Sequence, residues 1–417
     1  MHVLAVEHQQ GRLVVTVETD ATVAGCPSCG VIAVGHGRRV QEVADAPCFD
    51  LPVRVRWRKR IWRCADADCP TGTFSERHEL IARRAKLTAR AVGWATDALE
   101  HDDTTVSALA RHLGVDWHTC WVAVETEALR RLADPTRLAA VGTLGVDEHI
   151  WRPSRIGDAS RAVTSMVDLT RDANGHLHAR LLDVVPGRSG TAYAGWLKTQ
   201  EASFVAGVEH AALDPFRGYA NAIRDELPDA VAVLDAFHVV KLGTQVVDEV
   251  RRRVQQDTHG RRGHKDDPLY KIRGLLRRGA EHLSDKQTDR LNTCLRLGDP
   301  DFEVTVAWHA YQQLRSIYHT AEPARGRAVA DHVIDTFHAC PIPEVARLGR
   351  TLRHWKAHVL ARFDTERISN GGTEAVNLII EKTRRLAHGF RTFAHYRIRI
   401  LLAASGRRAY RRAATHA

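Results

Sequence analysis

The sequence lacks the features that would place the chain in a membrane. No stretch approaches the roughly 18 consecutive apolar residues that a transmembrane helix needs. The opening MHVLAVEHQQGRLVV also lacks a charged leader followed by a long apolar core. These two absences predict a soluble, cytoplasmic protein with no membrane partner. At 417 residues the chain has room for about two or three domains with cores of their own.

Acidic residues are outnumbered by basic ones. The chain has 60 Lys and Arg against 50 Asp and Glu, which gives a formal charge of +10 and a pI near 9.4. An excess of this sign favours polyanionic partners, although it carries no information about the fold. Basicity alone favours nucleic acid as a partner only modestly, because many soluble enzymes are also mildly basic.

Cysteine is scarce except near the start of the chain, where four of the eight cysteines form two pairs. CPSCG contains Cys26 and Cys29, and CADADC contains Cys64 and Cys69. In a reducing cytoplasm, thiolates at these spacings converge on a tetrahedral Zn²⁺ more often than they form disulfides. The pairs therefore predict a zinc ribbon with one structural zinc ion, and the alternative is scattered buried thiols. The other cysteines are interpreted as small apolar residues: Cys48, Cys120, Cys294 and Cys340.

The segment between the two cysteine pairs, LPVRVRWRKRIWRC, alternates apolar and basic residues. A period of two predicts a β-strand with one apolar and one basic face. The basic face carries Arg54, Arg56, Arg58 and Arg60, and we predict that it contacts DNA phosphates. The alternative is a solvated edge strand that its charges protect from pairing with another chain.

Helical periodicity runs through residues 87–132. Thr104 or Thr105 is a candidate N-cap of a short helix, Gly114 suits a turn, and a second helix is expected from Asp116. A small residue four positions before the turn glycine is typical of a helix-turn-helix, although other helical hairpins share this pattern. The second helix would present side chains to a DNA groove or backbone: Trp117, His118 and Thr119, with Arg130 and Arg131 as further candidates.

From LGVDEHIWRPS onward the pattern is typical of α/β proteins. Three strand-like segments come first: LGVDEHIW, AVTSMVDLT and ARLLDVVPGRS, the last two separated by an Asn-Gly turn. A helix from Gly190 to Gln200 follows, then FVAGVEHAALDPF as a strand ending at Asp214, RGYANAIRDELP as a helix and AVAVLDAFHVV as a fifth strand. Three meandering strands followed by helix, strand, helix and strand is the order of an RNase H-like fold.

A long helical stretch is expected from about Lys241 to Arg362. Within it, residues 251–278 carry ten Lys or Arg against three Asp. Such a run is usually a solvated helix face, and a contact with a DNA backbone is an equally weighted alternative.

The segment ISNGGTEAVNLIIEKTRRLAHGFRTFAHYRIRILL predicts a helix with an acidic first turn. Gly371 and Gly372 are expected to break the chain, Thr373 to cap the helix and Glu374 to project from its first turn. A glutamate at this position usually does no more than complement the helix dipole.

Five features together carry a resemblance to a known family. They are CPSCG, the helix-turn-helix pattern, GVDEHIW, LPDAVAVLDAFHVVKL and SNGGTEAVNLIIEKTRRLAHGFRTFAHYRIRILL. Along essentially its whole length the chain resembles bacterial insertion-sequence transposases of the ISL3 family. The resemblance implies a DDE transposase with an RNase H-like core, whose three carboxylates bind two Mg²⁺ or Mn²⁺ ions. It also implies N-terminal modules that recognise terminal inverted repeats, double-stranded target DNA as a second partner, a homodimer on DNA, and a cytoplasmic, nucleoid-associated location.

The chemistry of such an enzyme accounts for three acids. Two divalent ions about 3.5 to 4 Å apart activate the attacking oxygen and stabilise the departing one during in-line displacement at a phosphodiester. Hard cations prefer oxygen ligands. The reaction needs no protein nucleophile, and the sequence has no obvious Ser-His or Cys-His site.

The resemblance assigns Asp147 and Glu374 as the first and third acids, and leaves two candidates for the second. A motif search favours Asp235, because VLDAFH is conspicuous. Counting strands favours Asp214, which ends the fourth strand, whereas Asp235 ends the fifth. Asp235 with His238 then resembles the Cys-or-Asp, two residues, His signature of several cut-and-paste transposase families, which supports the active site or handles DNA. Two further strand-end acids are interpreted as structural: Asp168 and Asp183.

The predicted fold class is multidomain α+β. Its expected parts are a zinc ribbon in 1–80, a helix-turn-helix in 81–140, an RNase H-like core in 141–245, a helical insertion in 246–364, and the second part of the core in 365–417. If Glu374 points inward, Arg384 and Arg385 would lie along DNA. Two other functions stay open: a DNA-binding regulator or domesticated transposase without catalysis, and an RNase H-like nuclease.

Overall fold

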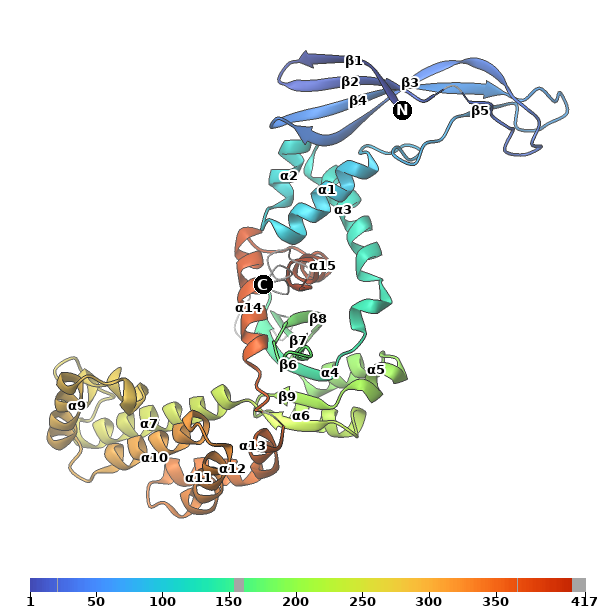
Figure 1. Ribbon diagram of the computed structural model, residues 1–417. Helices are drawn as coiled ribbons and strands as arrows, with labels where there is room; N and C mark the ends of the chain where they lie inside the picture. The colour runs from blue at the N-terminus through green and yellow to red at the C-terminus, as the bar shows by residue number, and fades with distance from the viewer. Residues whose placement is uncertain (21, 154–160, 366, 407–417) are drawn as a thin grey trace. The chain divides into compact units, whose positions relative to one another are not determined.

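The computed structural model describes residues 1–417 except 21, 154–160, 366 and 407–417 (Figure 1). The chain forms two compact units, Met1–Arg137 with the described part of Ile379–Ala417, and Leu138–Leu378. No described helix is both long enough and apolar enough to cross a membrane. The five predicted parts are finer than this division and stay predictions, and the end of the last one lies outside the described residues.

The first unit begins with a five-stranded sheet in the order β1-β2-β4-β3, with β5 paired to β4. The strands are β1 (His2–Gln9), β2 (Arg12–Glu18), β3 (Val34–Cys48), β4 (Leu51–Arg63) and β5 (Thr73–Ser75). The predicted basic strand is β4, and its apolar face buries Val53, Val55 and Trp57 in a small core. Because β2 and β3 pair with its two sides, β4 is an interior strand, and the edge-strand alternative is wrong.

Helices of the first unit share a second core. They are α1 (Ala89–His101), α2 (Val106–Leu113), α3 (Trp117–Leu132) and α15 (Phe393–Ala404), and the turn η1 (Pro135–Leu138) follows α3. Leu113, Trp121 and Leu402 are buried together in this core. The C-terminal helix α15 therefore packs with α1–α3, so the predicted last part, 365–417, is divided between the two units.

The predicted helix, turn and helix are confirmed in position. Thr105, the second of the two candidates, caps α2 by accepting the backbone N–H of Ala108. Gly114 ends α2 with φ of +60°, a conformation that glycine adopts without steric cost. Asp116 then caps α3 by accepting the N–H of Thr119.

The second unit contains a mixed five-stranded sheet in the order β10-β9-β6-β7-β8. The strands are β6 (Thr143–Ile150), β7 (Ala162–Asp168), β8 (Arg180–Pro186), β9 (His210–Leu213) and β10 (Val231–Leu234). The first three form an antiparallel meander, while β6, β9 and β10 run parallel. Helices α4 (Gly190–Leu197), α5 (Ala202–Gly207) and α6 (Arg217–Glu226) connect them, and the predicted element order is confirmed.

Two predicted strands are shorter than expected. The segment FVAGVEHAALDPF begins with α5, and only its middle part forms β9. The segment AVAVLDAFHVV leaves the sheet at Asp235, whose side chain accepts the N–H of His238 and starts α7 at Ala236. A side-chain cap at this point ends the strand, because it supplies the first turn of a helix with a hydrogen-bond partner. Asp214 and Asp235 still follow the fourth and fifth strands, as the strand count predicted.

Helices α7 to α13 confirm the long helical stretch, which begins at Ala236 and not at Lys241. They are α7 (Ala236–His259), α8 (Pro268–Lys271), α9 (Asp285–Gly298), α10 (Glu303–His319), α11 (Pro323–Thr336), α12 (Pro343–His354) and α13 (Lys356–Asp364), with 3₁₀ turns η3 (Leu275–Arg277), η4 (Ala280–His282) and η5 (Phe337–Ala339). Part of the basic run is used internally, because Arg253 pairs with both Glu303 and Glu344.

Helix α14 (Gly371–Leu386) begins earlier than predicted. Gly371 and Gly372 form its first turn and do not break the chain, and Thr373 lies buried inside the helix instead of capping it. A Cβ on Gly372 would lie 2.6 Å from Leu169 Cδ2 and 2.9 Å from Ala179 Cβ. Glycine is required here because the helix approaches its neighbours closely.

Gly145 on β6 provides a test of this close packing. A Cβ there would lie 2.6 Å from Thr373 Oγ1 and 2.7 Å from Asn370 Oδ1. Gly145→Ala should therefore destabilise the second unit by about 1–3 kcal/mol, the usual cost of overpacking, and lower its thermal unfolding midpoint by several degrees. Gly142→Ala is the control, because its new Cβ would meet only Thr170 Cγ2, at 3.8 Å. Equal midpoints for the two variants would contradict the packing.

Candidate active site

Three predicted acids meet at one edge of the second sheet because of strand register. Gly145 pairs with Ala212 between β6 and β9, and Leu213 pairs with Leu234 between β9 and β10. Parallel strands in this register bring Asp147, Asp214 and Asp235 to about the same height. Asp214 and Asp235 directly follow β9 and β10, whereas Asp147 lies inside the longer β6. Such an edge is where open α/β sheets bind their ligands.

Asp147 is held by hydrogen bonds from two directions. The side-chain amide of Asn377 on α14 donates to Asp147 Oδ2 at 2.7 Å, and the Glu148 N–H donates to Oδ1 at 2.7 Å. Burial and then the neighbouring Asp214 carboxylate raise the pKa of Asp147 to about 6, despite these donors. The carboxylates therefore repel one another, and a bound cation would relieve the repulsion.

His238 lies between two of the carboxylates. Its Nδ1 is 2.8 Å from Asp214 Oδ1 and 3.0 Å from Asp235 Oδ2. Burial alone would lower the pKa of the imidazole, but the two carboxylates outweigh it and raise the pKa to about 10. His238 is therefore a cation at neutral pH, and it offsets part of the negative charge at this sheet edge.

Asp214 and Asp235 differ in how their oxygens are occupied. Asp235 is 3% exposed; its Oδ1 accepts the Asn370 N–H at 3.0 Å and its Oδ2 accepts the His238 N–H at 3.2 Å. Burial would raise the pKa of Asp235, but the His238 and Asn370 donors outweigh it and lower the pKa. By contrast, Asp214 Oδ1 is buried and forms an ion pair with His238 at 2.8 Å, while no hydrogen bond or ion pair among the described residues engages Asp214 Oδ2. Asp214 is the acid with an oxygen available to a ligand.

Glu374 completes the acidic group from α14. Burial, followed by the charges of Asp235 and Asp214, raises the pKa of Glu374. Among the described residues its carboxylate has no hydrogen-bond or ion-pair partner, and the residue is exposed. A carboxylate that is near other carboxylates and not engaged by the protein fits a metal ligand better than simple dipole complementation.

The donor set fits a hard divalent cation. Asp214, Asp235 and His238 hold possible ligand atoms within 4.8 Å of one another, although a protonated His238 cannot coordinate a metal ion. Asp147 and Glu374 lie outside this cluster, but the charge of Asp214 contributes to raising the pKa of both. Close by, Asn377 Oδ1 is a second buried acceptor without a donor. Unsatisfied buried oxygens are costly in water-free surroundings, and Mg²⁺ and Mn²⁺ bind oxygen. The residues present therefore fit the divalent ions that the sequence predicted.

Asn370 joins three elements of this site and was not predicted from the sequence. Its N–H binds Asp235, its side-chain amide donates to the Val146 carbonyl at 3.3 Å, and its Oδ1 accepts from Thr373 Oγ1. It thereby fixes the start of α14 to the middle of β6 and to the residue that follows β10. The signal for it was present in the Ser-Asn-Gly motif, but nothing in a single sequence shows which strands the asparagine contacts.

The two acids interpreted as structural have protein partners. Asp168 pairs with Arg180 at 2.8 Å. Asp183 accepts the indole N–H of Trp196 at 3.2 Å and the N–H of Val184 at 2.7 Å. Neither belongs to the acidic group at the sheet edge.

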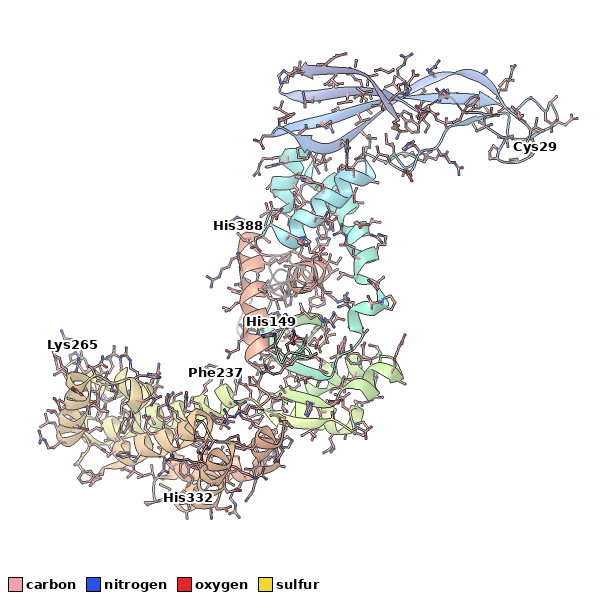
Figure 2. All side chains as sticks on the ribbon, in the orientation of Figure 1. Cys29, His149, Phe237, Lys265, His332 and His388 are labelled. Atoms are coloured by element: carbon pink, nitrogen blue, oxygen red, sulfur yellow. The ribbon has the colours of Figure 1, made fainter. Side chains whose placement is uncertain are left out.

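The four predicted cysteine ligands come together in the first unit. Cys26 Sγ lies 3.6 Å from Cys69 Sγ, and Cys29 Sγ lies 3.4 Å from Cys64 Sγ. The backbone N–H groups of Cys29 and Ser28 lower the pKa of Cys26 to about 6, which favours the thiolate that binds metal. Figure 2 shows Cys29 at one end of the β1–β5 sheet. All four sulfurs lie within 4.8 Å of one another, as one structural zinc ion requires.

The arginines of β4 are mostly paired within the protein. Arg54 donates to the Gly114 carbonyl, Arg56 pairs with Glu42, and Arg58 pairs with Glu18 at 3.1 Å. Arg60 donates to the carbonyls of Thr19 and Asp20 and lies 3.7 Å from Glu76. Their contact with DNA stays a prediction, and these partners would compete with phosphates for the same guanidinium groups.

Most of the other residues predicted to contact DNA already have partners within the protein. On α3, Trp117 stacks on Trp121 at 5.9 Å between ring centroids and Thr119 donates to Asp116, while His118 is exposed. On α14, Arg384 and Arg385 both pair with Glu381. A role in DNA binding stays a prediction for each of them.

Comparison with known proteins gives consistent similarities. Residues 144–400 match the family DDE_Tnp_ISL3, described as transposase, and residues 22–69 match the zinc finger of transposases IS204, IS1001, IS1096 and IS1165. The chain is 25% identical over 401 residues to the transposase for insertion sequence element IS1001 of Bordetella parapertussis, covering 94% of this chain and 92% of that protein. It is 24% identical over 370 residues to the transposase for IS1557 of Mycobacterium tuberculosis, covering 80% and 79% respectively.

Asn370→Ala tests the link between the elements of the site. The variant removes the side-chain bonds to the Val146 carbonyl and Thr373 while it keeps the backbone N–H, so the second unit should lose about 1–3 kcal/mol of stability. The measurement is the thermal unfolding midpoint. Asn221→Ala is the control, because Asn221 is exposed on α6 and its side chain contacts only Arg224 in the described structure. A midpoint for Asn370→Ala as high as that of the control would rule out a structural role for its side chain.

Proposed function

The chain belongs to the ISL3 family of DDE transposases, and on that premise we propose that it binds the terminal inverted repeats of an insertion sequence and cuts and joins DNA strands there. The proposed steps are Mg²⁺- or Mn²⁺-dependent hydrolysis at the element end, followed by attack of the released 3′-hydroxyl on target DNA. The observation that supports it best is the acidic group of Asp147, Asp214 and Glu374 at the edge of an RNase H-like sheet.

We assign the metal ligands by how accessible their carboxylates are. Asp147 and Asp214 are half-buried and Glu374 is exposed, so these three would hold two divalent ions, which supply charge stabilisation for the attacking and departing oxygens of the phosphodiester. Asp235 is buried and bonded to Asn370 and His238, so its proposed role is to position these two residues. This assignment agrees with the strand count and not with the conspicuous VLDAFH motif.

The residues around the acids prepare the site for a polyanionic substrate. Asn377 orients the Asp147 carboxylate, and Asn370 sets the position from which α14 projects Glu374. His238 keeps Asp214 in place by an ion pair and reduces the repulsion that an incoming phosphate would meet. These positions are fixed before substrate binds, so little reorganisation is needed in the reaction.

The first unit would supply DNA recognition. We propose that Cys26, Cys29, Cys64 and Cys69 hold one structural zinc ion, and that α2 and α3 act as a helix-turn-helix in which the exposed His118 and the half-buried Thr119 contact DNA. Arg384 and Arg385 are proposed as further backbone contacts. Because two element ends must be brought together, a homodimer is expected on DNA.

Two alternatives would use the same modules differently. A DNA-binding regulator would have kept the first unit and lost catalysis, and the presence of all three acids argues against it. An RNase H-like nuclease would nick nucleic acid without strand transfer. Strand-transfer products in a reaction with labelled element ends and target plasmid would separate the transposase from both alternatives.

Substitution of the acids tests the assignment. Asp147→Asn, Asp214→Asn and Glu374→Gln should bind a labelled element-end duplex normally and cleave it at least about a hundredfold more slowly, because each loses a metal ligand. Asp235→Asn should keep measurable nicking, with a loss of about ten- to a hundredfold, as is usual for residues that orient a ligand. Cleavage is measured in Mg²⁺ and in Mn²⁺. Activity in Asp214→Asn together with none in Asp235→Asn would reverse the assignment.

Removal of two cysteines tests the zinc site. The double variant Cys26→Ser, Cys29→Ser should lose its zinc and bind element ends more weakly, because two of the four proposed ligands are gone. Zinc per chain is measured by mass spectrometry. Cys48→Ser is the control, since Cys48 is exposed in the same unit and outside the cluster. A full zinc content in the double variant would exclude the proposed ligands.

A further inference from the structure

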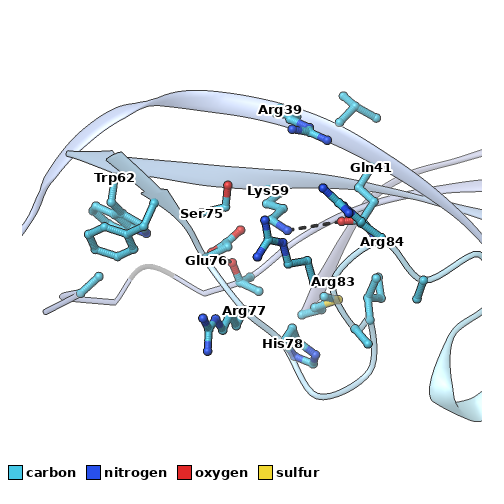
Figure 3. A pocket seen from close by; sticks show the side chains of 18 of the residues that line it. Arg39, Gln41, Lys59, Trp62, Ser75, Glu76, Arg77, His78, Arg83 and Arg84 are labelled. Carbon is cyan, nitrogen blue, oxygen red and sulfur yellow. Dashed lines mark hydrogen bonds between the residues drawn. The ribbon is translucent and has the colours of Figure 1, made fainter. Parts of the chain in front are cut away.

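A groove in the first unit collects basic side chains that the preceding sections do not use. It has a volume of about 1660 Å³ and is lined by residues of β3, β4, β5 and the segment that follows β5, together with Met1 and part of the segment between β2 and β3. Figure 3 shows Arg39 from β3, Lys59 from β4, and Arg83 and Arg84 from that segment around one space. The groove has six cationic residues: Arg39, Lys59, Arg77, Arg83, Arg84 and Lys86.

Two of the cations lie opposite each other on neighbouring strands. Arg39 and Lys59 are direct partners in the antiparallel pairing of β3 with β4. Like charges at opposed positions destabilise a sheet. Burial and then the charge of Arg39 lower the pKa of Lys59, and Arg83 contributes in the same direction. The fold therefore tolerates a repulsion that an anion between these side chains would remove.

The groove cations have no carboxylate partner in the described structure. Lys59 donates only to Gln41 Oε1 at 3.3 Å and lies over the Trp57 ring, whereas the other five have no described ion pair. The three acids that line the groove are engaged elsewhere: Asp20 with His2, Glu42 with Arg56, and Glu76 with Arg60 and Thr19. The groove thus keeps a local excess of positive charge that the protein does not neutralise.

Arg84 occupies a backbone position that suits glycine better. It lies in a turn closed by a hydrogen bond from the Ala85 N–H to the Ala82 carbonyl at 3.1 Å, and its φ is +60°. Non-glycine residues rarely adopt this conformation, and strain of this kind collects at functional positions. Replacement of Arg84 by glycine therefore removes a groove cation without straining the backbone.

The size of the groove argues for an extended ligand. Pockets for small molecules are usually about 300–1,000 Å³ and mostly apolar. This groove is larger and its lining is dominated by charged and polar side chains. Separate unpaired cations spread over an open surface match the spaced charges of a phosphodiester backbone.

We propose that this groove, and not the arginine face of β4, is the part of the β1–β5 sheet that binds the sugar-phosphate backbone of duplex DNA. The inference rests on the proposed function and makes it more specific, because it assigns the contact to named residues. Backbone contacts fix the position of a protein on DNA without reading its sequence. The groove should therefore contribute equally to binding of element ends and of unrelated duplexes.

The test compares full-length wild type with the variant Arg39→Gln, Lys59→Gln, Arg84→Gly. Affinity for a labelled element-end duplex and for an unrelated duplex of equal length is measured by fluorescence anisotropy across a salt series. The slope of log K against log[salt] is negative, and each lost phosphate contact makes it less steep by about 0.9. We expect the slope to become less steep by roughly 2 to 3. The affinity near 0.1 M salt should fall at least about tenfold for both duplexes. Glycine at position 84 suits the backbone there, so unfolding should not explain the loss.

Two further variants decide between the faces of the sheet. Arg38→Gln is the matched control, because Arg38 is next to Arg39 on β3 but pairs with Glu18; its slope should equal that of wild type. The rival variant removes Arg54, Arg56 and Arg58 together by substitution with Gln. If the rival loses the affinity and the groove variant keeps it, the inference is wrong. Zinc content and the unfolding midpoint are recorded for every variant, and a groove variant that loses zinc is replaced by Arg84→Gly alone.

The outcomes separate this inference from the proposed function. Wild type that binds and cleaves element ends, with an unchanged slope in the groove variant, overturns the groove and leaves the transposase function in place. Wild type that binds no duplex overturns both. A single-stranded RNA of equal length is the competitor; if the groove variant loses affinity for RNA alone, the groove is an RNA site and the inference fails.

Discussion

Repulsion among carboxylates at one sheet edge is the constraint on which the second unit depends. The parallel register of β6, β9 and β10 brings Asp147, Asp214 and Asp235 to one level, and α14 adds Glu374. The fold offsets this charge with one histidine, His238, and with amide donors, and it leaves the remainder for cations. The site is consequently acidic by construction, and the proposed divalent ions would neutralise it.

The same edge explains why several residues around it permit little variation. Asn370 contacts β6, Asp235 and the first turn of α14, so its position sets the distance between the helix and the sheet. Gly145 and Gly372 allow that distance to be short, because any Cβ at either residue would collide with neighbouring side chains. The geometry of the acids is thus supported by asparagine and glycine, and the acids themselves contribute mainly charge.

Charge is distributed differently in the first unit. Its sheet pairs most arginines of β4 with acidic side chains or backbone carbonyls, which makes that face stable without a ligand. The groove beside it leaves like charges opposed and unpaired, as at Arg39 and Lys59. Basic residues that look equivalent in the sequence therefore fall into two groups, those paired within the protein and those without an ion-pair partner. Only the second group can bind phosphate without first breaking an ion pair.

The sequence by itself determined the features that depend on neighbours along the chain. The cysteine spacings, the Gly114 turn with its capping residues, and the strand order through Asp214 and Asp235 all follow from local patterns, and the structure confirms them. Only tertiary structure decided that β4 is interior and that α15 packs with α1–α3. It also decided that Asp235, and not Asp214, is bonded to Asn370. Such contacts join residues that are far apart in the sequence: Asp235 and Asn370 are 135 positions apart, and Val146 and Asn370 are 224 apart. A local pattern carries no information about such partners, because the hydrogen bonds form only when the chain has folded.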